Sequence, residues 1–263
     1  MNNKDEMSFL EHLEDLRWHL LRSVMAILFF GSISFIFKDF IFDVIIFGPK
    51  NKDFFTYQLF CSISQSLGQG SAFCIEEIPF RIQSRTVSGQ FSAHLWTSIL
   101  SGFIISFPYV IYEFWKFISP GLYDKEKKSA KGFIFISSIL FFIGVLFGYY
   151  IVAPLSINFL GTYSVSTQIF NDFDLSSYIG LVRASVLASG IIFELPIIIY
   201  FLTKVGIVSP EFLKKNRKIS LVLVLSLSAI ITPPDIASQI IVSIPILILY
   251  EISIIISKIV IKR

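Results

Sequence analysis

Residues 184–203 read ASVLASGIIFELPIIIYFLT, twenty residues with one charged side chain, that of Glu194. A helix needs about 20 predominantly apolar residues to cross a bilayer, because the hydrocarbon core is about 30 Å thick. An ionised carboxylate inside that core is costly, so such a residue usually marks a functional site or a buried partner. Pro196 follows two residues later, and we expect it to kink the helix and free a backbone carbonyl near the acid.

Further long apolar runs place the whole chain in the membrane class. Of its 263 residues, 54% are hydrophobic and only 16% are charged, whereas a soluble domain carries about a quarter of charged residues. We therefore expect an all-α, polytopic membrane protein with a single membrane domain over residues 1–263. The expected spans are residues 18–37, 95–118, 132–157, 181–203, 219–231 and 236–256.

The fifth run is the shortest. Residues 219–231 would form about 20 Å of α-helix, which is less than the hydrocarbon thickness, so on its own this run could be re-entrant. Thr232-Pro233-Pro234-Asp235 and the apolar run after it favour a tight hairpin of two spans, with local thinning of the bilayer absorbing the mismatch. We therefore expect six transmembrane helices, with the short fifth span joined to the sixth by a Pro-Pro hairpin.

Lysine and arginine are distributed unevenly between the two sides of these spans. Sixteen lie on the side of the two termini and of the loops 119–131 and 204–218, and six lie in the loop 38–91 or at Arg183. Because lysine and arginine concentrate in cytoplasmic loops, we expect both termini to be cytoplasmic (N-in/C-in). Loop 38–91 then becomes a long periplasmic loop.

Both cysteines, Cys61 and Cys74, lie in this periplasmic loop. An oxidising compartment and 12 intervening residues are compatible with a disulfide. Two free thiols are the alternative, and the sequence leaves both open.

Residues 8–17 predict a cytoplasmic amphipathic helix that lies at the membrane interface before the chain turns into the first span. Ser8 and Glu11 have the spacing of a capping box, and leucines recur at helical spacing. The other face carries Glu14 and Asp15, although the negatively charged inner leaflet favours basic anchors. The helix is thus either an interfacial anchor or a binding site for something cationic.

Four motifs resemble those of the TatC family, the multispanning receptor of the twin-arginine protein translocase. In chain order they are Phe9-Leu10-Glu11-His12-Leu13-Glu14-Asp15-Leu16-Arg17, Phe117-Ile118-Ser119-Pro120-Gly121-Leu122-Tyr123 with Glu126, Phe193-Glu194-Leu195-Pro196, and Thr232-Pro233-Pro234-Asp235 with Gln239. The resemblance covers residues 7–256. It implies a signal-peptide receptor and core subunit of a Sec-independent translocase that exports folded proteins across the bacterial inner membrane, a multi-pass protein that is not an enzyme.

The resemblance also implies a site for the paired arginines of the signal peptide. Its carboxylates are Asp15 and Glu126, and Glu14, Arg17 and Phe117 belong to the same site. The family more often has glutamate where Asp15 stands, so this carboxylate reaches less far, which changes the affinity or gives Glu14 a share of the role. A guanidinium pairs bidentately with a carboxylate, so two acids can distinguish two arginines from lysines.

A second group of residues is implied to bind partners within the membrane, namely Glu194, Gln239, Asp235 and Pro196, with Gln239 expected beside Glu194. The implied partners are small single-span subunits of the TatA/TatB type, in an oligomeric complex surrounded by membrane lipid. No cofactor, metal or nucleic acid is expected.

Two other functions are compatible with an acid in an apolar span. A proton-coupled secondary transporter would use Glu194 as its midplane site, but such transporters usually show internal repeats and paired broken helices, and the sequence shows neither. For an intramembrane enzyme, the sequence contains no His-Glu-x-x-His pair, nucleophile elbow or phosphate-binding loop. The three histidines are scattered, and Glu113, near the end of a span, is expected at the membrane interface.

Overall fold

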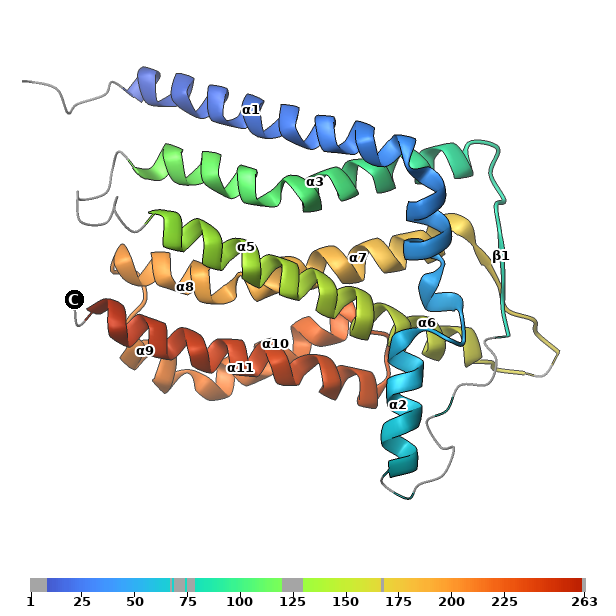
Figure 1. Ribbon diagram of the computed structural model, residues 1–263. Coiled ribbons are helices and arrows are strands. Elements are labelled where there is room, and N and C mark those ends of the chain that lie inside the picture. Colours follow the sequence, from blue (N-terminus) through green and yellow to red (C-terminus); the bar gives the residue numbers. More distant parts are fainter. Residues whose placement is uncertain are drawn as a thin grey trace, which may run out of the picture. The chain divides into compact units, whose positions relative to one another are not determined.

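The computed structural model describes residues 9–66, 68, 74, 79–119, 130–166 and 168–261. Helices dominate these residues (Figure 1), and the chain divides into two compact units. Unit 1 comprises Met1–Lys38 and His94–Ile139, and unit 2 comprises Asp39–Ala93 and Leu140–Arg263. The elements are α1 (Phe9–Ile36), η1 (Phe40–Ile46), η2 (Gly48–Lys50), α2 (Phe55–Ser66), β1 (Arg81–Gln83), α3 (Gly89–Ile118), α5 (Ala130–Phe147), η4 (Gly148–Val152), α6 (Ala153–Thr162), β2 (Asp172–Asp174), α7 (Leu175–Phe193), α8 (Leu195–Lys204), α9 (Pro210–Lys215), α10 (Arg217–Ile231) and α11 (Ile236–Ile261).

Five helical stretches among the described residues are long and apolar enough to cross a bilayer. They are His12–Ile36, Gly89–Ile118, Gly132–Thr162, Leu175–Lys204 and Ser238–Ile261. An all-α polytopic membrane protein is thereby confirmed. The expected fifth span corresponds to α10, which has only 15 residues. Whether α10 crosses the bilayer, which would give six spans in total, stays a prediction.

In unit 1, α1 and α3 lie side by side (Figure 1) and approach most closely where two glycines meet. A Cβ atom added to Gly102 would lie 2.5 Å from the backbone nitrogen of Gly31 and 2.7 Å from its Cα. Lipid tails are as apolar as leucine, so helices in a membrane associate largely through such close packing of small residues. The two glycines therefore set the distance between α1 and α3.

Helix α1 differs from the expected interfacial segment followed by a turn. It continues without interruption from Phe9 to Ile36, so residues 9–17 extend the first span. The sequence across this junction contains no glycine or proline that would break the helix. Contacts of His12 and His19 with α3 also hold this segment in line with the span.

Unit 2 repeats the same kind of packing between its own helices. Gly144 and Gly148 lie one helical turn apart and face α7. Added Cβ atoms would lie 2.7 Å from the carbonyl oxygen of Ser189 and 2.6 Å from that of Ser185, respectively. This small-xxx-small arrangement brings the two backbones close together.

Helices α10 and α11 lie side by side in unit 2 (Figure 1) and are joined by residues 232–235. The paired prolines there cannot continue a helix, because they lack a backbone N–H. Val224 of α10 packs in one core cluster with Val242 and Ile246 of α11. The predicted helical hairpin is therefore present, with a first arm of about 22 Å.

Most of the segment between α1 and α3 belongs to unit 2. Hydrogen bonds to backbone carbonyls and a short sheet connect it to the rest of that unit. The Tyr57 hydroxyl donates to the carbonyl oxygens of Pro49 (2.7 Å) and Pro154 (3.1 Å). Strand β1 pairs in parallel with β2, with Ile82 opposite Phe173. The described residues of 39–91 thus form a structured cap of unit 2.

Helix α7 begins at an aspartate cap beside this sheet. The Asp174 carboxylate accepts a hydrogen bond from the backbone N–H of Ser176 at 2.9 Å. This bond holds the pKa of the Asp174 carboxyl below its ordinary value. The start of the longest described apolar stretch of unit 2 is therefore set by a local polar contact.

The glycine contact in unit 1 leads to a stability prediction. Replacing Gly102 by alanine adds a Cβ against the α1 backbone, and we expect a loss of about 1–3 kcal/mol in the free energy of unfolding. Thermal unfolding in detergent or nanodiscs measures this loss. Gly132, in the same unit, has nothing within 4 Å of an added Cβ, so Gly132→Ala is the matched control. Equal midpoints for the two variants would contradict the proposed role of the contact.

Candidate functional site

Polar and aromatic side chains gather where α1 begins and α3 ends, in unit 1. On α1, His12, Asp15, His19 and Arg22 recur at spacings of three and four residues, so they share one face of the helix. On α3, Tyr109, Glu113 and Phe117 are four residues apart and likewise share a face. Contacts between the two sets show that these faces meet. We call these seven residues the α1–α3 cluster.

Two aromatic contacts lie at the end of the cluster nearest the start of α1. The His12 ring stacks on Phe117, with 4.5 Å between ring centroids and 21° between planes. The His19 ring meets Phe117 edge-on at 6.3 Å. Phe117 is consequently half-buried between two histidines of α1.

Glu113 forms the polar centre of the cluster. Its Oε2 lies 2.6 Å from Nδ1 of His19 and 3.6 Å from Nη1 of Arg22. Tyr109 also interacts with this carboxylate. Glu113 is only 2% exposed, because α1 packs over it, and its expected position at the membrane interface stays a prediction. A buried carboxylate requires such partners, since an uncompensated buried charge is strongly destabilising.

The structure separates the residues assigned to signal binding. Asp15 is partly exposed and lies on the α3-facing side of α1, between His12 and His19. Glu14 and Arg17 are exposed, and at 100° per residue they point about 100° and 200° away from Asp15. Glu126 lies outside the described residues.

Sequence reasoning missed Glu113 and His19. The spacing of His12, Asp15, His19 and Arg22 was a signal for a polar face on α1. Glu113 is 94 residues beyond His19, so only the packing of α3 on α1 could reveal the pair.

The stretch that contains Glu194 is divided at that residue, in unit 2. Helix α7 ends at Phe193, and α8 begins at Leu195. Pro196 stands in the first turn of α8, where its missing N–H is tolerated. The Glu194 carbonyl accepts hydrogen bonds from the N–H groups of Ile197 (2.9 Å) and Ile198 (3.0 Å). The helix is therefore interrupted where the sequence predicted a kink, and Glu194, 9% exposed, is buried at the break.

Asp235 and Gln239 hold the α10–α11 hairpin together. Oδ2 of Asp235 accepts from the backbone N–H (2.8 Å) and the hydroxyl (2.7 Å) of Ser238, capping the start of α11. Nε2 of Gln239 donates to the carbonyl oxygen of Leu225 at 3.1 Å. The expected contact of Gln239 with Glu194 is not among those that the described residues show, since its amide is directed to the backbone of α10.

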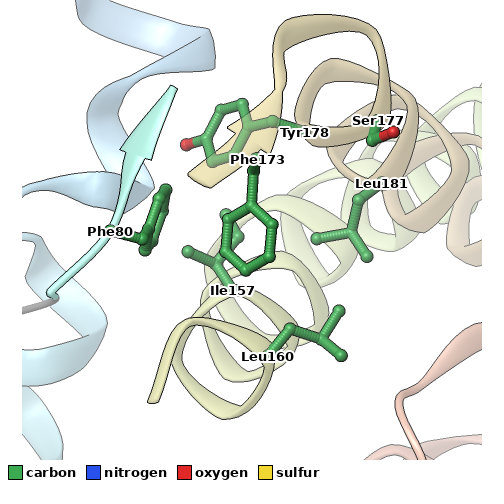
Figure 2. Close-up of a pocket in the computed structure, with 7 residues that line it drawn as sticks. All are labelled: Phe80, Ile157, Leu160, Phe173, Ser177, Tyr178 and Leu181. Carbon is green, nitrogen blue, oxygen red and sulfur yellow. The ribbon is translucent and has the colours of Figure 1, made fainter. Parts of the chain in front are cut away.

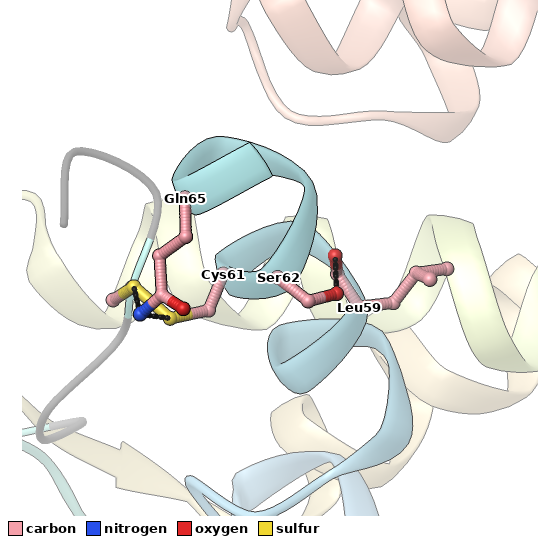
Figure 3. The surroundings of a disulfide bond; sticks show 5 residues. Leu59, Cys61, Ser62 and Gln65 are labelled. Atoms are coloured by element: carbon pink, nitrogen blue, oxygen red, sulfur yellow. Dashed lines mark hydrogen bonds between the residues drawn. A yellow bond between two sulfur atoms is a disulfide. The ribbon is translucent and has the colours of Figure 1, made fainter. Parts of the chain in front are cut away.

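Unit 2 also contains a disulfide and an apolar pocket. Cys61 and Cys74 are bonded, and Nε2 of Gln65 lies 3.6 Å from the sulfur of Cys61 (Figure 3). Figure 2 shows the pocket, whose volume is about 80 Å³. Seven residues line it, namely Phe80, Ile157, Leu160, Phe173, Ser177, Tyr178 and Leu181. No ionisable group except the tyrosine hydroxyl is among these lining residues, so the pocket does not offer a charge for an arginine.

Comparisons with known proteins agree on one family. Residues 11–245 match the family described as "Sec-independent protein translocase protein (TatC)". The TatC protein of Blattabacterium sp. subsp. Periplaneta americana (strain BPLAN) is 47% identical over 263 residues, which cover 100% of this chain and 99% of that relative. The TatC protein of Aquifex aeolicus (strain VF5) is 34% identical, over 98% of this chain and 97% of the relative. The solved structure titled "Crystal Structure of Twin Arginine Translocase Receptor- TatC" is similar with a TM-score of 0.69 and 32% identity, over 95% of this chain and 100% of that one.

The capping contact of Asp235 predicts a stability effect at a residue first assigned to partner binding. Asp235→Ala removes the acceptor at the start of α11 and should lower the free energy of unfolding by about 1 kcal/mol. Asp235→Asn retains a side-chain oxygen and should remain close to the wild-type stability. Thermal unfolding of both variants measures the difference, and an alanine variant as stable as the asparagine variant would rule out the capping role.

Proposed function

The chain belongs to the TatC family, and we propose that its twin-arginine site lies at the end of unit 1 that carries Asp15 and Phe117, with Glu126 as the second carboxylate. The family establishes the function in outline: a multi-pass, non-enzymatic membrane receptor of Sec-independent, twin-arginine protein export. It also decides against the proton-coupled transporter that the sequence had left open.

The observation that carries the proposal is the way in which the α1–α3 cluster distributes its charges. Within the described part of the chain, Glu113 interacts with the imidazole of His19 and the guanidinium of Arg22, and no ion pair involves Asp15. Asp15 is partly exposed on the same helix face. Its carboxylate is therefore available to a ligand, whereas that of Glu113 is already neutralised by the protein itself.

Glu126 is within reach of this end of the unit by chain length alone. Glu126 is seven residues beyond Ser119, and seven extended residues span up to about 25 Å. Two carboxylates can each form a bidentate pair with a guanidinium, which a lysine ammonium cannot reproduce. The site would thus select paired arginines over paired lysines.

We place this end of unit 1 in the cytoplasm. The excess of lysine and arginine on the side of both termini supports the N-in/C-in orientation and a location in the bacterial inner membrane. We also propose that α10 is a sixth, short span, because it forms a helical hairpin with α11 and its length can be matched by local bilayer thinning.

We assign Glu194 and Pro196 to contacts with small single-span subunits of the TatA/TatB type, in an oligomeric complex. A carboxylate at a helix break offers a polar contact at membrane depth, and such residues are retained mainly for function. Asp235 and Gln239 support this surface indirectly, because they hold the neighbouring hairpin of unit 2.

The receptor proposal is tested by peptide binding to the purified, full-length chain in nanodiscs. Asp15→Asn and Glu126→Gln should each weaken binding of a fluorescent twin-arginine signal peptide about tenfold, since each removes a charged hydrogen-bond acceptor. A peptide with both arginines replaced by lysine should bind the wild type correspondingly less tightly. Glu14→Gln is the matched control, because Glu14 points away from α3. Unchanged affinity in the Asp15 and Glu126 variants would disprove the site.

The proposed role of Glu194 predicts that a variant can keep signal-peptide binding while it loses association with the small subunits. Glu194→Ala should leave the affinity for the twin-arginine peptide within about twofold of wild type, because Glu194 lies in the other unit. The same variant should lose co-purification of the small single-span subunits and export of a folded reporter. A folded Glu194→Ala protein that retains its partners but loses the peptide would contradict this division.

A further inference from the structure

We infer that His19 and Glu113 are positioning residues of the twin-arginine site: their ion pair fixes the rotation of α1 against α3 and keeps Asp15 available to the ligand. The inference rests on the receptor site proposed above. It adds two residues that do not themselves contact the signal peptide.

The first argument is that stability does not account for the pair. Glu113 is 2% exposed, and taking a carboxylate and its partner out of water costs about as much as their attraction returns. Replacing such a pair by apolar side chains is often neutral or stabilising, and a well-attested use of buried polar pairs is to specify geometry. The pair therefore calls for a geometric explanation.

The second argument is its position relative to the site. His19 lies one turn beyond Asp15 on α1, and Glu113 lies one turn before Phe117 on α3. Rotating α1 by one residue, or about 100°, would turn Asp15 away from α3. The Gly31–Gly102 contact sets the distance between the two helices, but it lies about 18 Å beyond His19 along α1. A directional contact close to Asp15 is needed to hold the rotation at this end.

The third argument concerns competition within α1. Asp15 and His19 have the i, i+4 spacing at which an acid and a base on one helix pair with each other. In the structure, Nδ1 of His19 instead lies 2.6 Å from Oε2 of Glu113. Glu113 thereby keeps the imidazole of His19 from occupying the Asp15 carboxylate, which we assign to the signal arginine.

The decisive variant replaces the pair with apolar side chains, His19→Leu together with Glu113→Met, in the full-length chain. We expect its thermal midpoint to equal or exceed that of the wild type. Its affinity for the twin-arginine peptide should nevertheless fall about tenfold, and its preference over the twin-lysine peptide should shrink. A merely structural pair would not affect this preference without affecting the midpoint.

An exposed ion pair in unit 2 provides the matched control. Arg217 and Glu251 lie 2.6 Å apart with side chains 52% and 51% exposed. The double change Arg217→Leu and Glu251→Met should leave peptide affinity and selectivity at wild-type values. A loss as large as that of the His19/Glu113 variant would overturn the inference.

Two conservative changes at His19 keep the test informative even if the apolar variant does not fold. The amide nitrogen of asparagine can take the place of Nδ1, whereas that of glutamine falls nearer Nε2. His19→Asn should therefore bind the twin-arginine peptide within about twofold of wild type, and His19→Gln about fivefold more weakly. Equal affinities for these two variants would overturn the positioning role.

The outcome also distinguishes this inference from the receptor proposal. If Asp15→Asn weakens binding but the His19/Glu113 variant does not, the positioning role alone is disproved. If Asp15→Asn has no effect, the site itself is wrong, and the positioning role falls with it.

Discussion

Close backbone contact between helices is the constraint on which each unit of this protein depends. Lipid supplies no hydrophobic driving force for helix association. The helices therefore associate through close packing, which requires side chains small enough to let the backbones meet. Gly31 and Gly102 provide this contact in unit 1, and Gly144 and Gly148 provide it in unit 2. The α1–α3 cluster and the break at Glu194 lie on helices that take part in these contacts.

Within this frame, two buried carboxylates serve opposite purposes. Glu113 is surrounded by a histidine, an arginine and a tyrosine of its own unit, and we infer that these contacts orient α1. Glu194 lies buried at a break between two helices. Asp15, on the same helix face as His19, is partly exposed. Burial alone therefore does not identify a binding acid; the neighbouring charges decide.

Much of the fold was predictable because the membrane imposes it on the sequence. Backbone polar groups in hydrocarbon must bond within their own helix, so long apolar runs such as the one around Glu194 become helices. The proline after that acid predicted the break between α7 and α8. Two details depended on tertiary contacts: the expected turn after residue 17 is absent, since α1 continues without a break alongside α3, and Gln239 donates a hydrogen bond to the backbone of α10.

The sequence by itself determined the spans, the family motifs and the acidic residues, because apolar length and local spacing are properties of a segment alone. Tertiary structure decided which acid is neutralised and which remains available. Glu113 and His19 are 94 residues apart, and no local pattern links them. Only the approach of α3 to α1, permitted by two glycines, brings that imidazole to that carboxylate and leaves Asp15 accessible beside them.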